Sequence, residues 1–307
     1  MALVEAENLC KSFGAVKALA GLSFSVEEGE IFGLVGPDGA GKTTCLRILC
    51  GLMAPTSGKA MVLGRDVAVE PERIKGQVGY MAQPARLYED LTVKENIAFY
   101  ADLYEVPRER YRQRMDRLLE FSGLAPFTGR LFRNLSGGMK QKVGLSCSLI
   151  HTPKVLFLDE PTNGVDPVSR RDFWKILYEL KREKVTIVVA STYLDEADRC
   201  HRVAFFDRGK VRMVMEPLQV RNLLKAPLFN LTSRDRRKAL GRLKTLAEVR
   251  NPYVFGTGIH FFLSDPAHVP ELEASLASEG LRDVVIEQIQ PSLEDVYLSL
   301  LEERRGE

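Results

Sequence analysis

The fold is decided by one stretch, Gly36-Pro37-Asp38-Gly39-Ala40-Gly41-Lys42-Thr43-Thr44. An apolar run comes directly before it, Ile31-Phe32-Gly33-Leu34-Val35, and predicts a buried strand. The residues that follow, 44–50, have the apolar spacing of a helix. A strand, a loop that fits GxxxxGK[ST] and a helix form the context in which this pattern binds phosphate. The sequence therefore predicts a phosphate site at residues 36–44.

The residue types of the loop explain this prediction. Glycines let backbone N–H groups converge on phosphate oxygens, and the following helix N-terminus adds a partial positive charge. We expect Lys42 to reach the β- and γ-phosphates of a nucleotide and the Thr43 hydroxyl to hold Mg²⁺. The alternative is a glycine-rich turn with an incidental lysine, and it is disfavoured because further nucleotide motifs follow in order.

The composition is that of an ordinary globular protein of 307 residues, with 45% hydrophobic and 27% charged residues. A net charge of +2 gives no global argument for nucleic acid or for an anionic membrane. The five cysteines are scattered, which favours a reducing cytosol. The first residues lack the pattern of a signal peptide, and no apolar run approaches the ~20 residues that a membrane span needs. Any membrane role is therefore expected to come through a partner.

Strand and helix patterns alternate along most of the chain. Strands are expected at 3–9, 22–31, 59–64, 78–83, 154–159, 185–190 and 202–207. Helices are expected from Pro71, at 167–184 and at 193–199, and residues 92–151 look helical almost throughout, with a break at Pro107. This pattern predicts an α/β core with a buried, mostly parallel sheet and an inserted helical block.

A second candidate site follows the apolar run Val155-Leu156-Phe157-Leu158, which ends in Asp159 and Glu160. Ligand sites in open α/β sheets lie at the carboxyl ends of the strands. We expect Asp159 to orient the Mg²⁺ shell and Glu160 to accept a proton from an attacking water, a role typically worth ~10²–10⁴-fold in rate. The alternative is a helix or turn cap, since acidic residues before a proline often serve as one.

The C-terminal region differs from the rest of the chain in the distribution of its charged residues. Residues 221–250 carry nine Lys or Arg, and residues 251–307 carry eleven Asp or Glu against three Arg. Strands are expected at 228–232, 247–255, 259–263 and 283–290, with helices at 234–245, 267–279 and from about 292. The order βαββαβ matches the ferredoxin-like motif and predicts a second, accessory α+β domain over 226–307. The basic run is interpreted as the solvated face of one helix, with a membrane or nucleic-acid patch as the less favoured alternative.

Further motifs identify a family resemblance. The stretch Leu135-Ser136-Gly137-Gly138-Met139-Lys140-Gln141-Lys142 resembles the signature motif of ABC ATPases, and it lies between the phosphate loop and Asp159-Glu160 as in that family. The resemblance covers residues 1–217, with a helical subdomain at about 92–151. The stretch Gln290-Pro291-Ser292-Leu293-Glu294-Asp295-Val296-Tyr297 resembles the C-terminal region of drug-export ATPases of the daunorubicin-resistance type, in the ABC-2 group.

The resemblance implies ATP and Mg²⁺ as cofactors and assigns roles at matching positions. Nucleotide contacts are implied for Phe13, Val16, Gly36, Asp38, Gly39, Ala40, Gly41, Lys42, Thr43 and Thr44. Metal contacts are implied for Thr43, Gln83 and Asp159, and catalytic roles for Glu160, Gln83 and Thr192. Phe13 would stack on adenine, a contact that needs only an aromatic ring.

The same resemblance implies two kinds of partner. A second ABC ATPase would face this chain, and its nucleotide would contact Ser136, Gly137, Gly138 and Asp166. Membrane-spanning permease subunits would dock on residues 84–105, which include Tyr88 and Glu89. The implied location is cytoplasmic, peripheral at the cytoplasmic face of the membrane, and no nucleic-acid partner is expected.

Three positions depart from the family pattern. Asp38 replaces the usual asparagine of the phosphate loop, and it resembles the first ATPase half of two-ATPase exporters. Met139 replaces a frequent glutamine, and both changes are expected to be tolerated. The third is Thr192, which stands where the family has its switch histidine, before Tyr193. Threonine has a short hydroxyl and carries no charge, so this ATP site is expected to be weakened.

The sequence therefore predicts an ATP-binding and ATP-hydrolysing subunit that powers an ABC exporter through separate membrane subunits. Two alternatives remain open. One is a regulatory nucleotide-binding subunit with little turnover, which Thr192 makes plausible. The other is an ABC ATPase that acts on ribosomes or DNA, although such proteins usually show two ATPase cores or a long coiled coil in one chain.

Overall fold

The computed structural model of the protein describes residues 2–85, 87–221, 226–281 and 283–303. Contacts divide the chain into two compact units, Met1–Met215 and Glu216–Glu307. The sequence places the boundary between 217 and 226, whereas α8 (Pro217–Arg221) already belongs to the second unit. Among the described residues, no helix has both the length and the apolar character that crossing a bilayer requires.

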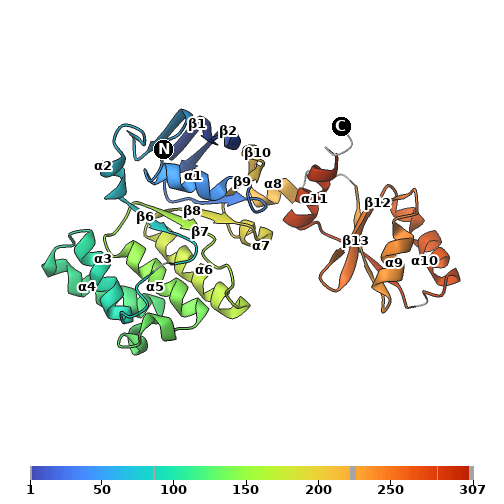
Figure 1. Cartoon of the computed structure of the whole chain (residues 1–307). Coiled ribbons are helices and arrows are strands. Elements are labelled where there is room, and N and C mark those ends of the chain that lie inside the picture. Colours follow the sequence, from blue (N-terminus) through green and yellow to red (C-terminus); the bar gives the residue numbers. More distant parts are fainter. Residues whose placement is uncertain (1, 86, 222–225, 282, 304–307) are drawn as a thin grey trace. The chain divides into compact units, whose positions relative to one another are not determined.

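A six-stranded sheet forms the centre of the first unit (Figure 1). Its strand order is β10-β9-β3-β8-β7-β6. Its members are β3 (Ile31–Val35), β6 (Val78–Met81), β7 (Val155–Asp159), β8 (Thr186–Ser191), β9 (Arg202–Asp207) and β10 (Lys210–Met215). All neighbours pair in parallel except β9 and β10. Every residue of β3, β7 and β8 is buried, which explains their continuous apolar runs. The prediction of a buried, mostly parallel sheet is confirmed.

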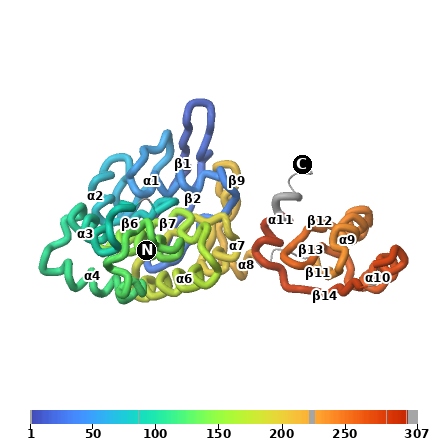
Figure 2. The backbone as a smooth tube through the Cα atoms, turned by 60° about the horizontal axis from the view of Figure 1, so that its bottom comes forward, coloured from blue at the N-terminus to red at the C-terminus, as the bar shows by residue number. Residues whose placement is uncertain are grey.

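A separate antiparallel sheet, β2-β1-β4-β5, was not anticipated from the sequence. It contains β1 (Ala2–Phe13), β2 (Val16–Glu27), β4 (Ser57–Val62) and β5 (Arg65–Asp66). The strand expected at 3–9 continues to Phe13 in β1, which pairs there with Val16, the first residue of β2. The strand expected at 22–31 ends at Glu27, and Glu28-Gly29-Glu30 separates it from β3. Figure 2 shows the β1–β2 hairpin, in dark blue, extending beyond the rest of the first unit.

Helices flank the central sheet at the predicted places. They are α1 (Lys42–Leu49), α2 (Pro71–Lys75), α6 (Pro167–Arg182) and α7 (Leu194–Ala197). The helical block contains α3 (Val93–Leu103), α4 (Arg108–Ser122) and α5 (Gly137–Leu149), joined through η1 (Ala125–Phe127) and η2 (Phe132–Asn134). Thr92 and Glu95 form a capping box at the start of α3, and left-handed Gly123 ends α4. The block has its own apolar core, which includes Ile97, Leu119 and Val143.

The second unit contains β11 (Leu228–Thr232), α9 (Arg236–Leu243), β12 (Val249–Phe255), β13 (Gly258–Leu263), η3 (Pro266–His268), α10 (Val269–Ser278), β14 (Val285–Ile289) and α11 (Leu293–Glu303). Its four strands form an antiparallel sheet in the order β12-β13-β11-β14. Residues of β11, β13, α9 and α10 share one apolar core. The element order agrees with the predicted βαββαβ order, and the ferredoxin-like classification stays a prediction.

Four of the nine basic residues of 221–250 lie on α9. Ala239 and Leu243 of this helix are buried, whereas Arg236, Arg237 and Lys238 are exposed. The helix also reaches the acidic half of the unit, since Arg242 Nε lies 2.8 Å from Glu279 Oε1. These contacts agree with the interpretation of the run as the outer face of one helix.

Candidate active site

The phosphate loop joins β3 to α1, as the sequence predicts, and its shape depends on glycine. At Gly36, an added Cβ would lie 2.2 Å from the carbonyl oxygen of Phe206. At Gly41, φ is +104°, and an added Cβ would lie 2.6 Å from the carbonyl oxygen of Ala18. A side chain at either position would clash with backbone atoms. The loop can therefore lie this close to β9 and β2 only because both positions are glycine.

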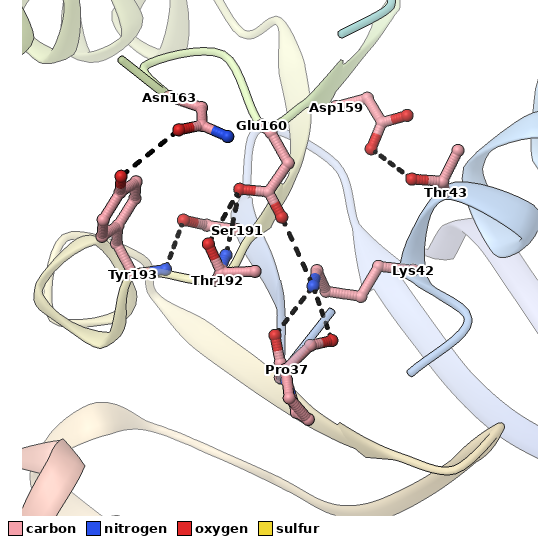
Figure 3. A network of polar contacts seen from close by, with 10 residues as sticks. Pro37, Lys42, Thr43, Asp159, Glu160, Asn163, Ser191, Thr192 and Tyr193 are labelled. Carbon is pink, nitrogen blue, oxygen red and sulfur yellow. Dashed lines mark hydrogen bonds and ion pairs between the residues drawn. The ribbon is translucent and has the colours of Figure 1, made fainter. Parts of the chain in front are cut away.

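Lys42 begins α1 and folds back across the loop that precedes it. Its Nζ donates hydrogen bonds to the carbonyl oxygens of Gly36 (2.7 Å) and Pro37 (3.1 Å) (Figure 3). The same nitrogen lies 3.3 Å from Glu160 Oε1, and the side chains of Lys42 and Glu160 are both almost fully buried. Lys42 therefore places one positive charge between the phosphate loop and the end of β7.

Asp159 is the last residue of β7, and it is 2% exposed. The Thr43 hydroxyl donates to its Oδ1 over 2.9 Å (Figure 3), and the Tyr80 hydroxyl donates to its Oδ2 over 3.2 Å. Thr43 and Asp159 are far apart in the sequence and adjacent in space because α1 covers the carboxyl ends of β3 and β7. This geometry agrees with the expectation that Thr43 and Asp159 contact the same metal ion.

Thr43 and Asp159 provide oxygen donors of the kind that Mg²⁺ binds. The described residues contain no group of three or more His, Cys, Asp or Glu side chains arranged to hold a metal ion. Thr43 and Asp159 do present two hard oxygen donors 2.9 Å apart, beside the phosphate loop. Mg²⁺ is commonly held by one or two protein oxygens together with substrate phosphates and waters, so this pair fits a cation that arrives with a nucleotide.

Glu160 follows β7 in a left-handed conformation, with φ at +49°. Its backbone N–H donates to the carbonyl oxygen of Ala190 over 2.9 Å, which fixes the turn. Its Oε2 accepts from the Thr192 backbone N–H (3.1 Å) and the Thr192 hydroxyl (3.3 Å), as Figure 3 shows. A non-glycine residue in this conformation typically costs about 1–3 kcal/mol, which is expected where a side chain must be aimed at a functional site.

Burial raises the pKa of the Glu160 carboxyl, and the hydrogen bond from the Thr192 backbone and the charge of Lys42 oppose that rise only in part. A carboxylate whose pKa is raised binds a proton more readily than one in water. This property suits a general base, whose efficiency improves as its pKa approaches the working pH.

Phe13 and Val16 face each other at the end of the β1–β2 hairpin, and they are 49% and 66% exposed. Lys11 Nζ lies 5.3 Å from the centre of the Phe13 ring. The next part of β2 passes the phosphate loop, where Ala18 approaches Gly41. An exposed aromatic ring on a strand that borders the loop is accessible to a nucleotide base, although the described contacts do not join the ring to the loop.

Gln83 lies just beyond β6, where it is exposed. Because β6 and β7 pair in parallel, their carboxyl ends lie at the same edge of the sheet. The described residues show no hydrogen bond from Gln83 to Asp159 or Glu160. The structure therefore places Gln83 beside the site without bringing it into the cluster.

The residues expected to serve an opposite nucleotide form a second group. Ser136 caps α5 by accepting from Met139 N (3.3 Å), and Asp166 caps α6 by accepting from Ser169 N (2.9 Å). A Cβ at Gly138 would lie 2.6 Å from Ser169 Cβ, so this glycine permits close packing of α5 on α6, whereas Gly137 is exposed. Within the described residues, neither cap is hydrogen-bonded to Lys42 or Glu160.

Sequence reasoning missed two side chains near the site. Tyr80 contacts Asp159, and its only sequence signal is its position three residues before Gln83 on a strand that borders β7. Glu196 is 1% exposed and accepts hydrogen bonds from the Thr162 hydroxyl and from Trp174 Nε1 (3.1 Å). It thereby ties α7, which follows Thr192, to α6, and no pattern in the sequence marks this contact.

The chain is similar to known ATP-binding proteins of transporters. A family model described as ABC transporter matches residues 19–163. The chain is 42% identical over 286 residues to a probable multidrug ABC transporter ATP-binding protein of Escherichia coli K12, covering 92% of this chain and 49% of that protein. It therefore spans about half the length of that relative. It is 35% identical over 303 residues to a daunorubicin resistance ATP-binding protein of Streptomyces coeruleorubidus, covering 97% of this chain and 94% of that protein.

A solved structure shares the fold. It is a dimeric ATP-binding cassette in a post-hydrolysis state bound to ADP and Pi, with a TM-score of 0.64 and 25% identity, covering 69% of this chain and 98% of that one. The predicted α/β ATPase core with an inserted helical block is therefore confirmed. Together with the phosphate loop and the acidic pair after β7, these similarities show that the chain belongs to the family of ABC transporter ATP-binding proteins.

Proposed function

We propose that this chain binds and hydrolyses ATP and thereby powers export through separate membrane subunits. The observation that carries the proposal is the cluster of Lys42, Asp159 and Glu160 at one edge of the central sheet. Lys42 would bind nucleotide phosphates, and Glu160, with its raised pKa, would accept the proton of the attacking water. Mg²⁺, held by Thr43 and Asp159 with help from Gln83, would neutralise phosphate charge.

The names of the relatives support this proposal. The Escherichia coli relative is a probable multidrug transporter ATP-binding protein, and the Streptomyces relative is a daunorubicin resistance protein. We infer that the cargo is a small molecule that contacts the membrane subunits. The solved cassette that holds ADP and Pi is dimeric, which supports a pair of ATPase chains as the working unit.

The geometry of Thr192 supports a weakened ATP site in this chain. Its hydroxyl donates to Glu160 Oε2 at 3.3 Å, so it is directed at the base. A histidine at this position would offer a longer donor toward the terminal phosphate, and one such donor is typically worth ~10²–10³ in rate. We infer that the chain hydrolyses ATP weakly alone and works best when paired with a second ATPase that keeps its histidine.

Membrane subunits are proposed to dock near residues 84–105, at the cytoplasmic face of the membrane. Tyr88 is 50% exposed, and its ring lies 4.7 Å from that of Phe99, which is also exposed. Leu103, 62% exposed, adds a third apolar side chain on the same helix as Phe99. Such exposed aromatic residues are typical of the centre of a protein–protein interface.

Two alternative functions are separated by experiment. A regulatory subunit would bind nucleotide with little turnover in any combination, and a soluble ATPase would not respond to membrane subunits. The test measures ATP turnover of the purified wild type and of Thr192→His, each alone and with candidate membrane subunits. We expect slow wild-type turnover, a gain of ~10²-fold with histidine and stimulation by the membrane subunits. Wild-type turnover of ~1 s⁻¹ or more, with no gain from histidine, would contradict the weakened site.

A further inference from the structure

Tyr80 lies on β6 beside the acidic pair, on the face of the sheet that α1 covers. Successive side chains of a strand point to opposite faces, so Val78 and Tyr80 of β6 share a face, as do Phe157 and Asp159 of β7. Tyr80 pairs in parallel register with Phe157, two residues before Asp159. This register places the phenol one diagonal step from the carboxylate, within reach of a tyrosine side chain.

The Asp159 carboxylate is held from two sides by two hydroxyl groups. Thr43, from the first turn of α1, donates to Oδ1 over 2.9 Å, and Tyr80, from the neighbouring strand, donates to Oδ2 over 3.2 Å. Binding of a nucleotide with its metal ion would affect these two hydrogen bonds differently. A metal ion held by Thr43 would compete for the hydroxyl's interaction with Asp159, whereas the contact of Tyr80 lies on the other oxygen.

We propose that Tyr80 is a positioning residue that fixes the Asp159 carboxylate, through Oδ2, so that Oδ1 is presented to the Mg²⁺ of a bound nucleotide. This inference rests on the proposed function, since it assumes that Asp159 serves the metal. Groups that hydrogen-bond to a metal ligand orient it, and their loss typically lowers metal affinity or activity 10–100-fold. Tyr80 would therefore set the concentration of Mg²⁺ at which nucleotide binding becomes tight.

The phenol is suited to act as a permanent donor. A tyrosine hydroxyl has an ordinary pKa of about 10, so it keeps its proton and can donate at physiological pH. The ring of Tyr80 packs against the main apolar core of the first unit. Phenylalanine would keep this packing and remove only the hydroxyl, which contacts Asp159 and also the Arg47 side chain.

The test separates metal affinity from nucleotide affinity. The wild type and Tyr80→Phe are titrated with a fluorescent ATP analogue, first in EDTA and then over a range of Mg²⁺ concentrations. We expect equal affinity in EDTA, within about twofold, and a Mg²⁺ concentration for half-maximal enhancement that is ~10-fold or more higher in the variant. A purely structural role of Tyr80 would instead lower the affinity in EDTA or the melting temperature.

Tyr111→Phe is the matched control, because Tyr111 is also a partly buried tyrosine that packs against an apolar core, here that of the helical block. It should match the wild type in both titrations. Asp159→Asn tests the assumption beneath the proposal, since it should abolish the enhancement by Mg²⁺. If Mg²⁺ has no effect on the wild type, the proposed metal site is wrong. If Asp159→Asn loses the enhancement while Tyr80→Phe keeps the wild-type midpoint, the proposal for Tyr80 alone is overturned.

Discussion

Two buried carboxylates, Glu160 in the first unit and Asp295 in the second, differ in how completely they are hydrogen-bonded. Asp295 is fully buried, and it accepts from the Tyr253 hydroxyl, from Ser292 N (2.6 Å) and from the Ser292 hydroxyl, with His260 Nδ1 2.6 Å away. Burial acts to raise its pKa, but these partners outweigh burial and the pKa is lowered. Glu160 has fewer partners, and burial leaves its pKa raised.

The difference separates a structural carboxylate from a candidate catalytic one. Asp295 holds the start of α11 against β12 and β13, and its charged form is the stable form in the fold. Among the described residues, the Glu160 carboxylate is held by Lys42 and Thr192 only, and its charged form is disfavoured. A general base must accept a proton during its reaction. Having few hydrogen-bond partners is therefore useful for the Glu160 carboxylate, whereas it would destabilise the fold at Asp295.

The largest effect on ligand binding is expected from Lys42→Ala. Hydrogen bonds to charged groups contribute about 1.5–3 kcal/mol, so ATP affinity should fall ~10–100-fold. The variant also removes the positive partner of Glu160. Titration with a fluorescent ATP analogue measures the change, and Lys59→Ala, an exposed lysine on β4, is the control. Equal affinity in Lys42→Ala and the wild type would remove Lys42 from the site.

Asp295→Asn should destabilise the second unit by about 1–3 kcal/mol, because an amide cannot accept from all four donors and leaves buried groups unpaired. Hydrogen exchange of β13 amides would report the loss locally, as faster exchange in the variant. Glu273→Gln, an exposed acid on α10, should change nothing. Unchanged exchange in Asp295→Asn would mean that the network adds little to the fold.

The effect of Asp295→Asn should depend on pH. A group whose folded pKa is lowered contributes stability that is present above its unfolded value, here 3.8, and is lost as the pH falls through the folded pKa. The stability difference between wild type and Asp295→Asn should therefore be full at pH 5–7 and should shrink below about pH 4. Denaturant unfolding at several pH values checks this, and a difference that grows on acidification would contradict it.

Glu160→Gln should have the smallest effect on stability, under about 1 kcal/mol at pH 7. Because the pKa of Glu160 is raised in the folded state, the folded state binds this proton more tightly than the unfolded state, whose value is 4.5. The stability that the proton contributes is present below pH 4.5 and is lost as the pH rises through the folded pKa. At pH 7 the charged carboxylate adds little to stability, and an amide can replace it. A large loss in thermal unfolding would place Glu160 with Asp295 as a structural residue.

Most of the architecture could be predicted because it follows from local sequence patterns. The buried strands β3, β7 and β8 are continuous apolar runs, and the phosphate loop is a glycine pattern between a strand and a helix. The antiparallel sheet could not be predicted, because pairing of β1 with β2 and β4 is a long-range choice that strand propensity does not encode.

The candidate site divides in the same way. Lys42, Asp159 and Glu160 stand in local motifs, so the sequence identifies them. Tyr80 and Glu196 act through contacts between elements that are distant in the sequence, and a single tyrosine or glutamate carries no signal of such a contact. Thr192 was singled out by its departure from a family pattern, and the sequence could not show that its hydroxyl is directed at Glu160.

The most direct test of the account measures ATP binding and ATP hydrolysis of Glu160→Gln beside the wild type, with enzyme in excess so that one turnover is followed. Only the base is lost in this variant, so ATP should bind within about twofold of the wild-type affinity while hydrolysis slows by ~10²–10⁴-fold. Hydrolysis at the wild-type rate would contradict the assignment of Glu160 as the base.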